Sequence, residues 1–100
     1  MALVDISEYS NLARDGRNDI IQAGAEPPQA QQQVAITAGS VQSSAFGTTT
    51  RFLRVHTDAA ARVEIGVNPT AAATSRRMAA GATEYFGAIP GQKIAVITTT

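Results

Sequence analysis

The sequence contains no cysteine and no tryptophan, and it has a single histidine, His56. The chain therefore cannot form a disulfide, and one imidazole without thiolates is a poor basis for a metal site. The absence of cysteine fits a protein that is assembled in a reducing cytoplasm. We expect neither a metal nor a cofactor.

Long apolar runs and an excess of charge of one sign are also missing. No segment approaches the roughly 18 apolar residues that a membrane-spanning helix needs. Asp5 and Glu8 interrupt the start of the chain, where a signal peptide would have its apolar region. The net charge is zero, which argues against a protein that binds nucleic acid through phosphate contacts. The composition predicts neither a membrane partner nor a nucleic-acid partner.

Residues 1–32 are polar and rich in turn signals. Ser7 is placed to cap one or two helical turns, Asp15-Gly16 marks a turn, and Pro27-Pro28 leads into a Gln-rich stretch. Ile20-Ile21 is an isolated, strongly apolar pair in this segment. So polar a segment buries too little apolar surface to fold alone. We predict an extended N-terminal arm over residues 1–32 that becomes ordered only on a partner.

Residues 33–100 have the pattern of short strands separated by turns. Arg62 to Val67 alternates polar and apolar residues, as a half-buried strand does. Pro90-Gly91 fits the two central positions of a type II turn, and residues 70–80 are predicted to form a loop. About six such strands at regular spacing are typical of a sandwich or barrel. The fold class is therefore predicted to be all-β: a small β-sandwich or barrel-like domain, residues 33–100, with the extended arm.

The core of this domain is predicted from the apolar residues that share a strand face. Val63, Ile65 and Val67 are assigned inward because Arg62 and Glu64 must face water. A domain of about 68 residues is marginal alone and is usually helped by oligomerisation when disulfides and metals are absent. The predicted core residues are Val34, Ile36, Phe46, Leu53, Val55, Val63, Ile65, Val67, Phe86, Ile94 and Val96.

Charge is divided between the two segments. Residues 1–32 hold five acidic and two basic residues, a net of −3, whereas residues 33–100 hold three acidic and six basic residues, a net of +3. Opposite charges attract an acidic arm to a basic body, within one molecule or between neighbours. Two independently solvated surfaces explain the same division equally well.

No group of residues has the pattern of a catalytic site. His56 is the only candidate base, and its nearest charged neighbour on the same strand face is Arg54 rather than a carboxylate. Asp58, Glu64 and Glu84 are explained as turn residues and outward-facing strand residues. We therefore predict no enzymatic activity and no catalytic residue.

Five residues are predicted to contact partners instead. Ile20 and Ile21 are the apolar anchor of the arm. Tyr85 is adjacent to Phe86, so one ring points inward and the other outward, and an outward tyrosine is a frequent interface anchor. Arg76-Arg77 is the only basic doublet, with two solvated loop arginines as the alternative interpretation.

Half of the chain also resembles a known class of proteins. The segments Ile65-Gly-Val-Asn-Pro-Thr-Ala71, Arg77-Met-Ala-Ala-Gly81 and Pro90-Gly-Gln-Lys-Ile-Ala-Val-Ile97 resemble small virion proteins of tailed bacteriophages. The resemblance covers residues 51–97 and does not include the predicted arm. Among such proteins, capsid decoration (cement) proteins are small, β-rich and free of cysteine, and they carry an extended arm.

The resemblance implies a structural role. A decoration protein on the capsid surface of the virion would bind the major capsid protein and copies of itself, as a dimer or trimer, through multivalent contacts. The alternative is a tail-fibre or baseplate module that recognises a host glycan or a neighbouring tail protein. The number of copies per particle distinguishes these two functions.

Overall fold

The computed structural model describes residues 2–99 and contains β-strands but no helix in that range. The prediction of an all-β fold is confirmed. The strands are β1 (Leu3–Tyr9), β2 (Leu12–Arg14), β3 (Ile20–Gly24), β4 (Ala30–Ala35), β5 (Val41–Gln42), β6 (Phe52–Thr57), β7 (Ala61–Gly66), β8 (Arg76–Met78), β9 (Thr83–Gly87) and β10 (Lys93–Thr98).

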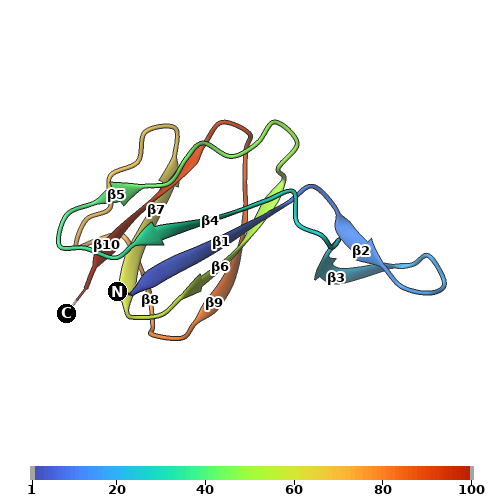
Figure 1. The fold of residues 1–100 in the computed structure, drawn as a ribbon, viewed down its shortest axis with the longest axis horizontal. Coiled ribbons are helices and arrows are strands. Elements are labelled where there is room, and N and C mark those ends of the chain that lie inside the picture. Colours follow the sequence, from blue (N-terminus) through green and yellow to red (C-terminus); the bar gives the residue numbers. More distant parts are fainter. Residues whose placement is uncertain (1, 100) are drawn as a thin grey trace.

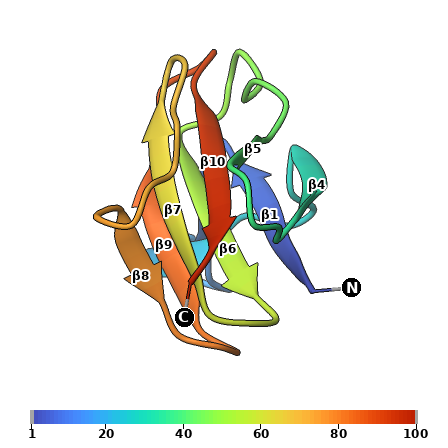
Figure 2. The ribbon, with the colours of Figure 1, turned by 90° about the vertical axis from the view of Figure 1, so that its left-hand side faces the viewer.

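Two four-stranded antiparallel sheets pack face to face, and a separate two-stranded hairpin extends from one end (Figure 1). The first sheet has the strand order β4-β1-β6-β9, and the second has the order β5-β10-β7-β8. In Figure 2 the second sheet lies in front of the first. The molecule measures 46 × 26 × 22 Å along its principal axes, and the hairpin β2–β3 accounts for its elongated shape.

The core lies between the two sheets and consists of alternate residues of their strands. Val4 and Ile6 of β1 meet Leu53 and Val55 of β6 in one layer. The facing layer includes Val63, Met78, Ile94 and Val96, all of which are buried. Alternation with period two therefore places apolar side chains inside both sheets.

The predicted division of the chain at residue 32 is wrong. Residues 3–9 form β1, which lies between β4 and β6 in the middle of the first sheet, and residues 30–32 belong to β4. No helix caps on Ser7, because Val4, Ile6 and Glu8 all face the interior with the period of a strand. Only residues 10–29 leave the sandwich, and within them β2 and β3 pair as a hairpin.

Most of the predicted core is correct, with one clear error. Val34, Phe46, Leu53, Val55, Val63, Ile94 and Val96 are buried, and Ile36, Ile65 and Phe86 are partly buried against them. Val67, by contrast, is 76% exposed, because β7 ends at Gly66 and the alternation ends with it. The core also contains Val4, Ile6 and Met78. The sequence pattern predicts Val4 and Ile6 in the arm and Met78 in a loop.

The connections between strands agree with the turn signals. Ile89 accepts a hydrogen bond from the amide of Gln92 at 3.1 Å, and Gly91 has a φ of +86°, which is the geometry expected for Pro90-Gly91 in a type II turn. Residues 70–80 form a loop as predicted, except that Arg76–Met78 adds β8 to the edge of the second sheet.

Candidate functional site

The hairpin is shaped by its own polar residues. Its loop closes around Asp15, whose Oδ1 accepts hydrogen bonds from the amides of Arg17 at 2.8 Å and Asp19 at 3.1 Å. Asn18 has a φ of +66°, a conformation that asparagine tolerates, and its carbonyl accepts a hydrogen bond from Arg14 at 2.7 Å. These contacts fix the tip but supply no apolar core. The hairpin therefore depends on other contacts for its position.

Tyr9 holds the base of the hairpin against the first sheet. Its hydroxyl donates a hydrogen bond to Oε2 of Glu26 at 2.7 Å, and its ring stacks on Phe52 with a centroid separation of 5.2 Å and an angle of 16°. The hydrogen bond to Glu26 raises the pKa of Tyr9 above 10.0, and burial and the charge of Glu26 act in the same direction. The chain entering and the chain leaving the hairpin are thus tied together at one aromatic residue.

Gly24 lies directly against this ring. A Cβ atom built on Gly24 would be 2.5 Å from two ring carbons of Tyr9, so only glycine permits the approach. By contrast, a Cβ on Gly16 in the loop would have no neighbour within 4 Å. The position of β3 over the sheet therefore depends on the absence of a side chain at residue 24.

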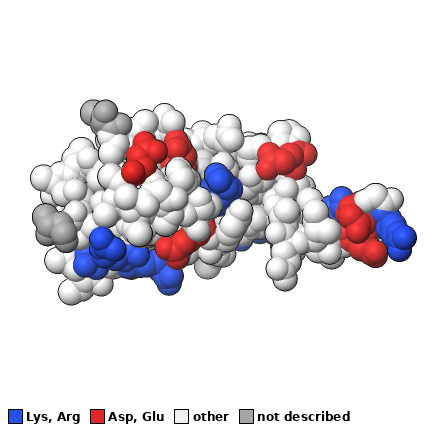
Figure 3. Space-filling view, turned by 90° about the horizontal axis from the view of Figure 1, so that it is seen from below, with Lys and Arg blue, Asp and Glu red and all other residues white. Residues whose placement is uncertain are grey.

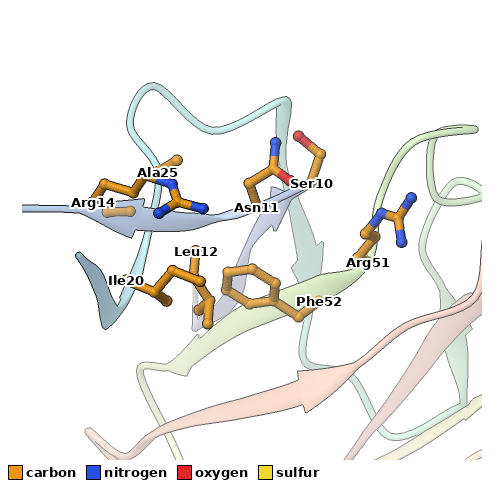
Figure 4. Close-up of a pocket in the computed structure, with 9 residues that line it drawn as sticks. Ser10, Asn11, Leu12, Arg14, Ile20, Ala25, Arg51 and Phe52 are labelled. Carbon is orange, nitrogen blue, oxygen red and sulfur yellow. The ribbon is translucent and has the colours of Figure 1, made fainter. Parts of the chain in front are cut away.

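An apolar hollow opens where the hairpin leaves the sandwich. It has a volume of about 720 Å³, and its lining includes Leu12, Ile20 and Phe52. Figure 4 shows these three side chains directed toward one another beneath β2. A second hollow of about 380 Å³ shares Leu12 and Phe52 and extends to Gly24 and Tyr85. We call these adjoining hollows the apolar cleft.

The side chains around the apolar cleft are unusually exposed for their type. Ile20 is 61% exposed, Tyr85 is 63% exposed and Leu12 is 45% exposed. Exposed apolar residues that gather beside a hollow are typical of interaction sites, whereas single exposed residues are not. The cleft is therefore the best candidate for a functional site in residues 2–99.

The structure brings together two of the predicted contact residues and separates the others. Ile20 and Tyr85 both line the apolar cleft, with Leu12 and Phe52 between them. Ile21 follows Ile20 on β3, so it faces the opposite side of the hairpin. The sequence pattern does not identify Leu12 as a contact residue, because the pattern predicts a short helix at that position. Recognition of residues 12–14 as a strand would have identified Leu12.

Arg76 and Arg77 lie elsewhere, on β8 at the edge of the second sheet. Arg76 forms an ion pair with Glu84 at 3.5 Å, and its guanidinium lies 5.2 Å from the ring centre of Phe86. It therefore closes one side of the sandwich, bridging β8 and β9. Arg77 is exposed beside Arg62 of β7. Neither arginine contributes to the apolar cleft.

The division of charge along the sequence does not become a division in space. Asp5 and Glu8, counted with the acidic arm, lie on β1 in the sandwich. The hairpin itself carries both signs, with Arg14 and Arg17 beside Asp15 and Asp19. Figure 3 shows this mixture at the hairpin and a separate gathering of basic side chains on the sandwich. The idea of an acidic arm attracted to a basic body therefore does not apply.

His56 lies on the outer face of the first sheet. Its Nδ1 is 2.8 Å from Oγ1 of Thr83, and Asp5 is its cross-strand neighbour on β1. The carboxylate of Asp5, however, accepts a hydrogen bond from Gln33 at 2.7 Å, and in residues 2–99 the one ion pair is that of Arg76 with Glu84. His56 thus has a hydroxyl neighbour but no hydrogen-bonded carboxylate. A catalytic base is normally oriented by such a third group.

Glu8 is a buried carboxylate with a structural set of partners. It is 2% exposed, and it accepts hydrogen bonds from the amide of Gly47 at 2.9 Å, the hydroxyl of Thr50 at 2.7 Å and the amide side chain of Gln32 at 3.3 Å. These donors come from β4 and from the loop before β6. Glu8 therefore fastens that loop to the first sheet.

Side chains that could bind a metal do not gather in the described part of the chain. No three His, Cys, Asp or Glu side chains come together to hold a metal ion within residues 2–99. The described chain also has no helix long and apolar enough to cross a membrane.

Comparison of the chain with protein-family models, with curated proteins and with solved structures finds no match.

Proposed function

We propose that this chain is a structural virion protein of a tailed bacteriophage that decorates the capsid. In this role it binds the head shell and stabilises it by non-covalent contacts, with no turnover of a substrate. The observation that carries the proposal is the hairpin β2–β3, which extends from the sandwich and exposes Leu12 and Ile20 beside Tyr85.

The apolar cleft supplies the binding energy in this proposal. Burying a side chain such as leucine or isoleucine contributes roughly 1.5–3 kcal/mol relative to leaving it in water. Tyr85 adds a large ring that loses little conformational entropy on binding, as interface anchors do. Because Tyr9 and Gly24 hold the hairpin in place, the cleft is preorganised, which reduces the cost of association.

The resemblance to virion proteins supports the scaffold part of the proposal. The segment that carries it, residues 51–97, contains the strands β6 to β10 and most of the second sheet. The hairpin lies outside that segment. In this proposal the residues of the resemblance build part of the sandwich, and the hairpin supplies the contact with the head.

The proposed partners are the major capsid protein and further copies of this chain. A decoration protein occupies the outer surface of the virion after assembly in the host cytoplasm. Many equivalent sites on a shell multiply modest contacts into stable attachment. A small sandwich with one projecting hairpin fits such an arrangement, because the hairpin reaches past the body of the molecule toward a neighbouring subunit.

A test of the location uses purified particles of the parent phage. Quantitative mass spectrometry of separated heads and tails should find the protein on heads, in a number of copies comparable with that of the major capsid protein. Recovery with tails in a few copies per particle would contradict the proposal and favour the tail-fibre or baseplate function.

A further inference from the structure

The strand β9 is a free edge of the first sheet. It pairs with β6 on one side, and no other described strand pairs with it. The opposite edge, β4, lies close to β5, and Gln32 of β4 exchanges two hydrogen bonds with the backbone of Ser44. In the second sheet the edge strands β5 and β8 have only two and three residues. β4, with six residues, is also paired on one side only, but β9, with five, is the edge strand that exposes an aromatic side chain, Tyr85, at 63%.

The backbone groups on this edge can be assigned from the flanking hydrogen bonds. The amide of Ala88 bonds to the carbonyl of Arg51 at 2.9 Å, and the amide of Thr57 bonds to the carbonyl of Ala82 at 3.1 Å. Because an antiparallel ladder alternates, even-numbered residues of β9 face β6 and odd-numbered residues face away. Thr83, Tyr85 and Gly87 therefore direct their amides and carbonyls to the free edge, and all three residues are exposed.

Two devices that protect edge strands are missing from β9. It contains neither proline nor lysine, both of which discourage pairing with another chain. Its one inward-facing charge, Glu84, forms an ion pair with Arg76 at 3.5 Å and is thus neutralised within the chain. An exposed strand of this kind is a ready template for strand addition.

We propose that two copies of this chain pair through β9, edge to edge and antiparallel, to form a dimer with a continuous eight-stranded sheet. A two-fold axis at Tyr85 places Tyr85 opposite its own copy and Thr83 opposite Gly87 of the other copy. By symmetry Gly87 also lies opposite Thr83 of the other copy, which makes three pairs. Each pair exchanges two hydrogen bonds, so about six backbone hydrogen bonds form. The two Tyr85 rings become cross-strand neighbours on the outer face, and aromatic pairs stabilise such contacts.

A second copy is the occupant that this edge fits best. The register about Tyr85 is self-complementary, as an isologous two-fold contact requires. The added strand also meets no unpaired charge, because Glu84 already has Arg76. The pairing uses the backbone of β9, whereas head binding in the proposed function uses Leu12 and Ile20 of the hairpin together with Tyr85, which both contacts share. Variants of Leu12 and Ile20 therefore test head binding without changing β9.

The test is sedimentation velocity of the full chain over a range of concentrations. We expect a dimer of twice the 10.4 kDa chain mass that dissociates on dilution. Tyr85→Pro removes an edge amide but no bond to β6, so it should give a folded monomer. Tyr85→Ala keeps the amide and should weaken the dimer without abolishing it. A monomer at all concentrations, a trimer, or a dimer unaffected by Tyr85→Pro would each overturn the proposal.

Hydrogen exchange gives a second measurement that needs no variant. In the dimer the amides of Thr83, Tyr85 and Gly87 should exchange slowly, and dilution to the monomer should raise their exchange rates while those of Glu84 and Phe86 stay slow. Fast exchange at the three edge amides in a dimeric sample would show that another surface forms the contact, and would overturn the pairing through β9.

Discussion

The hydroxyl of Tyr9 lies 2.7 Å from the carboxylate of Glu26, and this contact joins the end of β1 to the segment that follows β3. The two residues therefore bracket the hairpin, which begins three residues after Tyr9 and ends two residues before Glu26. Stacking of Tyr9 on Phe52 extends the same connection into the first sheet. The direction in which the hairpin projects is set at this point.

Removing the hydroxyl should loosen this connection. Tyr9→Phe keeps the stacked ring but leaves Glu26 without its donor, and a typical hydrogen bond contributes about 0.5–1.5 kcal/mol. We expect a loss of unfolding free energy in that range, measured by urea denaturation. No loss would mean that Tyr9 holds the hairpin by stacking alone.

The same pair makes stability depend on pH. Because the pKa of Tyr9 is raised in the folded state, its contribution is complete below the unfolded pKa of about 10 and declines as the pH rises through the folded value. The difference in unfolding free energy between the native protein and Tyr9→Phe should therefore be constant to about pH 10 and shrink above it. A difference that grows above that pH would contradict the assignment.

Gly24 offers a direct test of the close approach to Tyr9. Gly24→Ala places a methyl group 2.5 Å from the ring, which should cost about 1–3 kcal/mol through overpacking. Gly16→Ala is the matched control, since nothing lies within 4 Å of its Cβ position, and it should change stability by less than about 0.5 kcal/mol. Equal effects of the two substitutions would show that the ring moves aside freely.

The buried carboxylate of Glu8 should be among the most sensitive positions. Glu8→Ala leaves the donors of Gly47 and Thr50 without their acceptor, and each unsatisfied buried group costs about 1–3 kcal/mol. We expect a loss of at least about 2 kcal/mol in chemical denaturation. Thr50→Val should cost less, because the amide of Gly47 keeps its partner.

Two apolar positions test the core as the structure defines it. Ile94 is fully buried, so Ile94→Ala should cost about 2–5 kcal/mol. Val67 is 76% exposed, and Val67→Ala should change stability by less than about 0.5 kcal/mol. A large loss at Val67, measured in the same denaturation experiment, would restore the inward assignment that its sequence pattern predicts.

The sequence is sufficient to predict the sandwich where local pattern and burial agree. Alternation in Arg62 to Ile65 and the turn at Pro90-Gly91 reflect short-range backbone preferences, and both appear in the structure as predicted. β1 is not predictable in the same way, because its inward position 8 is a glutamate, whose burial depends on donors from residues 32, 47 and 50. Such distant partners cannot be read from the neighbouring sequence.

The apolar cleft is predictable only in part. Ile20 and Tyr85 stand out in the sequence as exposed apolar residues, but they are 65 positions apart, and their placement around one cleft depends on Leu12 and Phe52. That arrangement follows from the register of β1 with β6 and of β6 with β9. Sequence pattern indicates which side of a strand a residue occupies, whereas register decides which residues meet.

The central claim is that the apolar cleft attaches this protein to the phage head. Deletion of residues 1–32 is unsuitable as a test, because it removes β1 from the middle of the first sheet. A double variant, Leu12→Ser with Ile20→Ser, changes only exposed side chains of the cleft. Its control, Val67→Ser with Ile89→Ser, changes two aliphatic side chains that are more exposed, 76% and 64% against 45% and 61%, and that lie outside the cleft.

The decisive measurement is the affinity of these two variants for purified heads that lack the protein, determined by co-sedimentation. In the proposed complex the aliphatic side chains of Leu12 and Ile20 become buried against the head. Their loss should therefore weaken binding of the cleft variant by about 100-fold or more. The control variant should bind as the native protein does. If both variants decorate heads with native affinity, the cleft does not carry the attachment and the proposed mechanism of head binding is wrong.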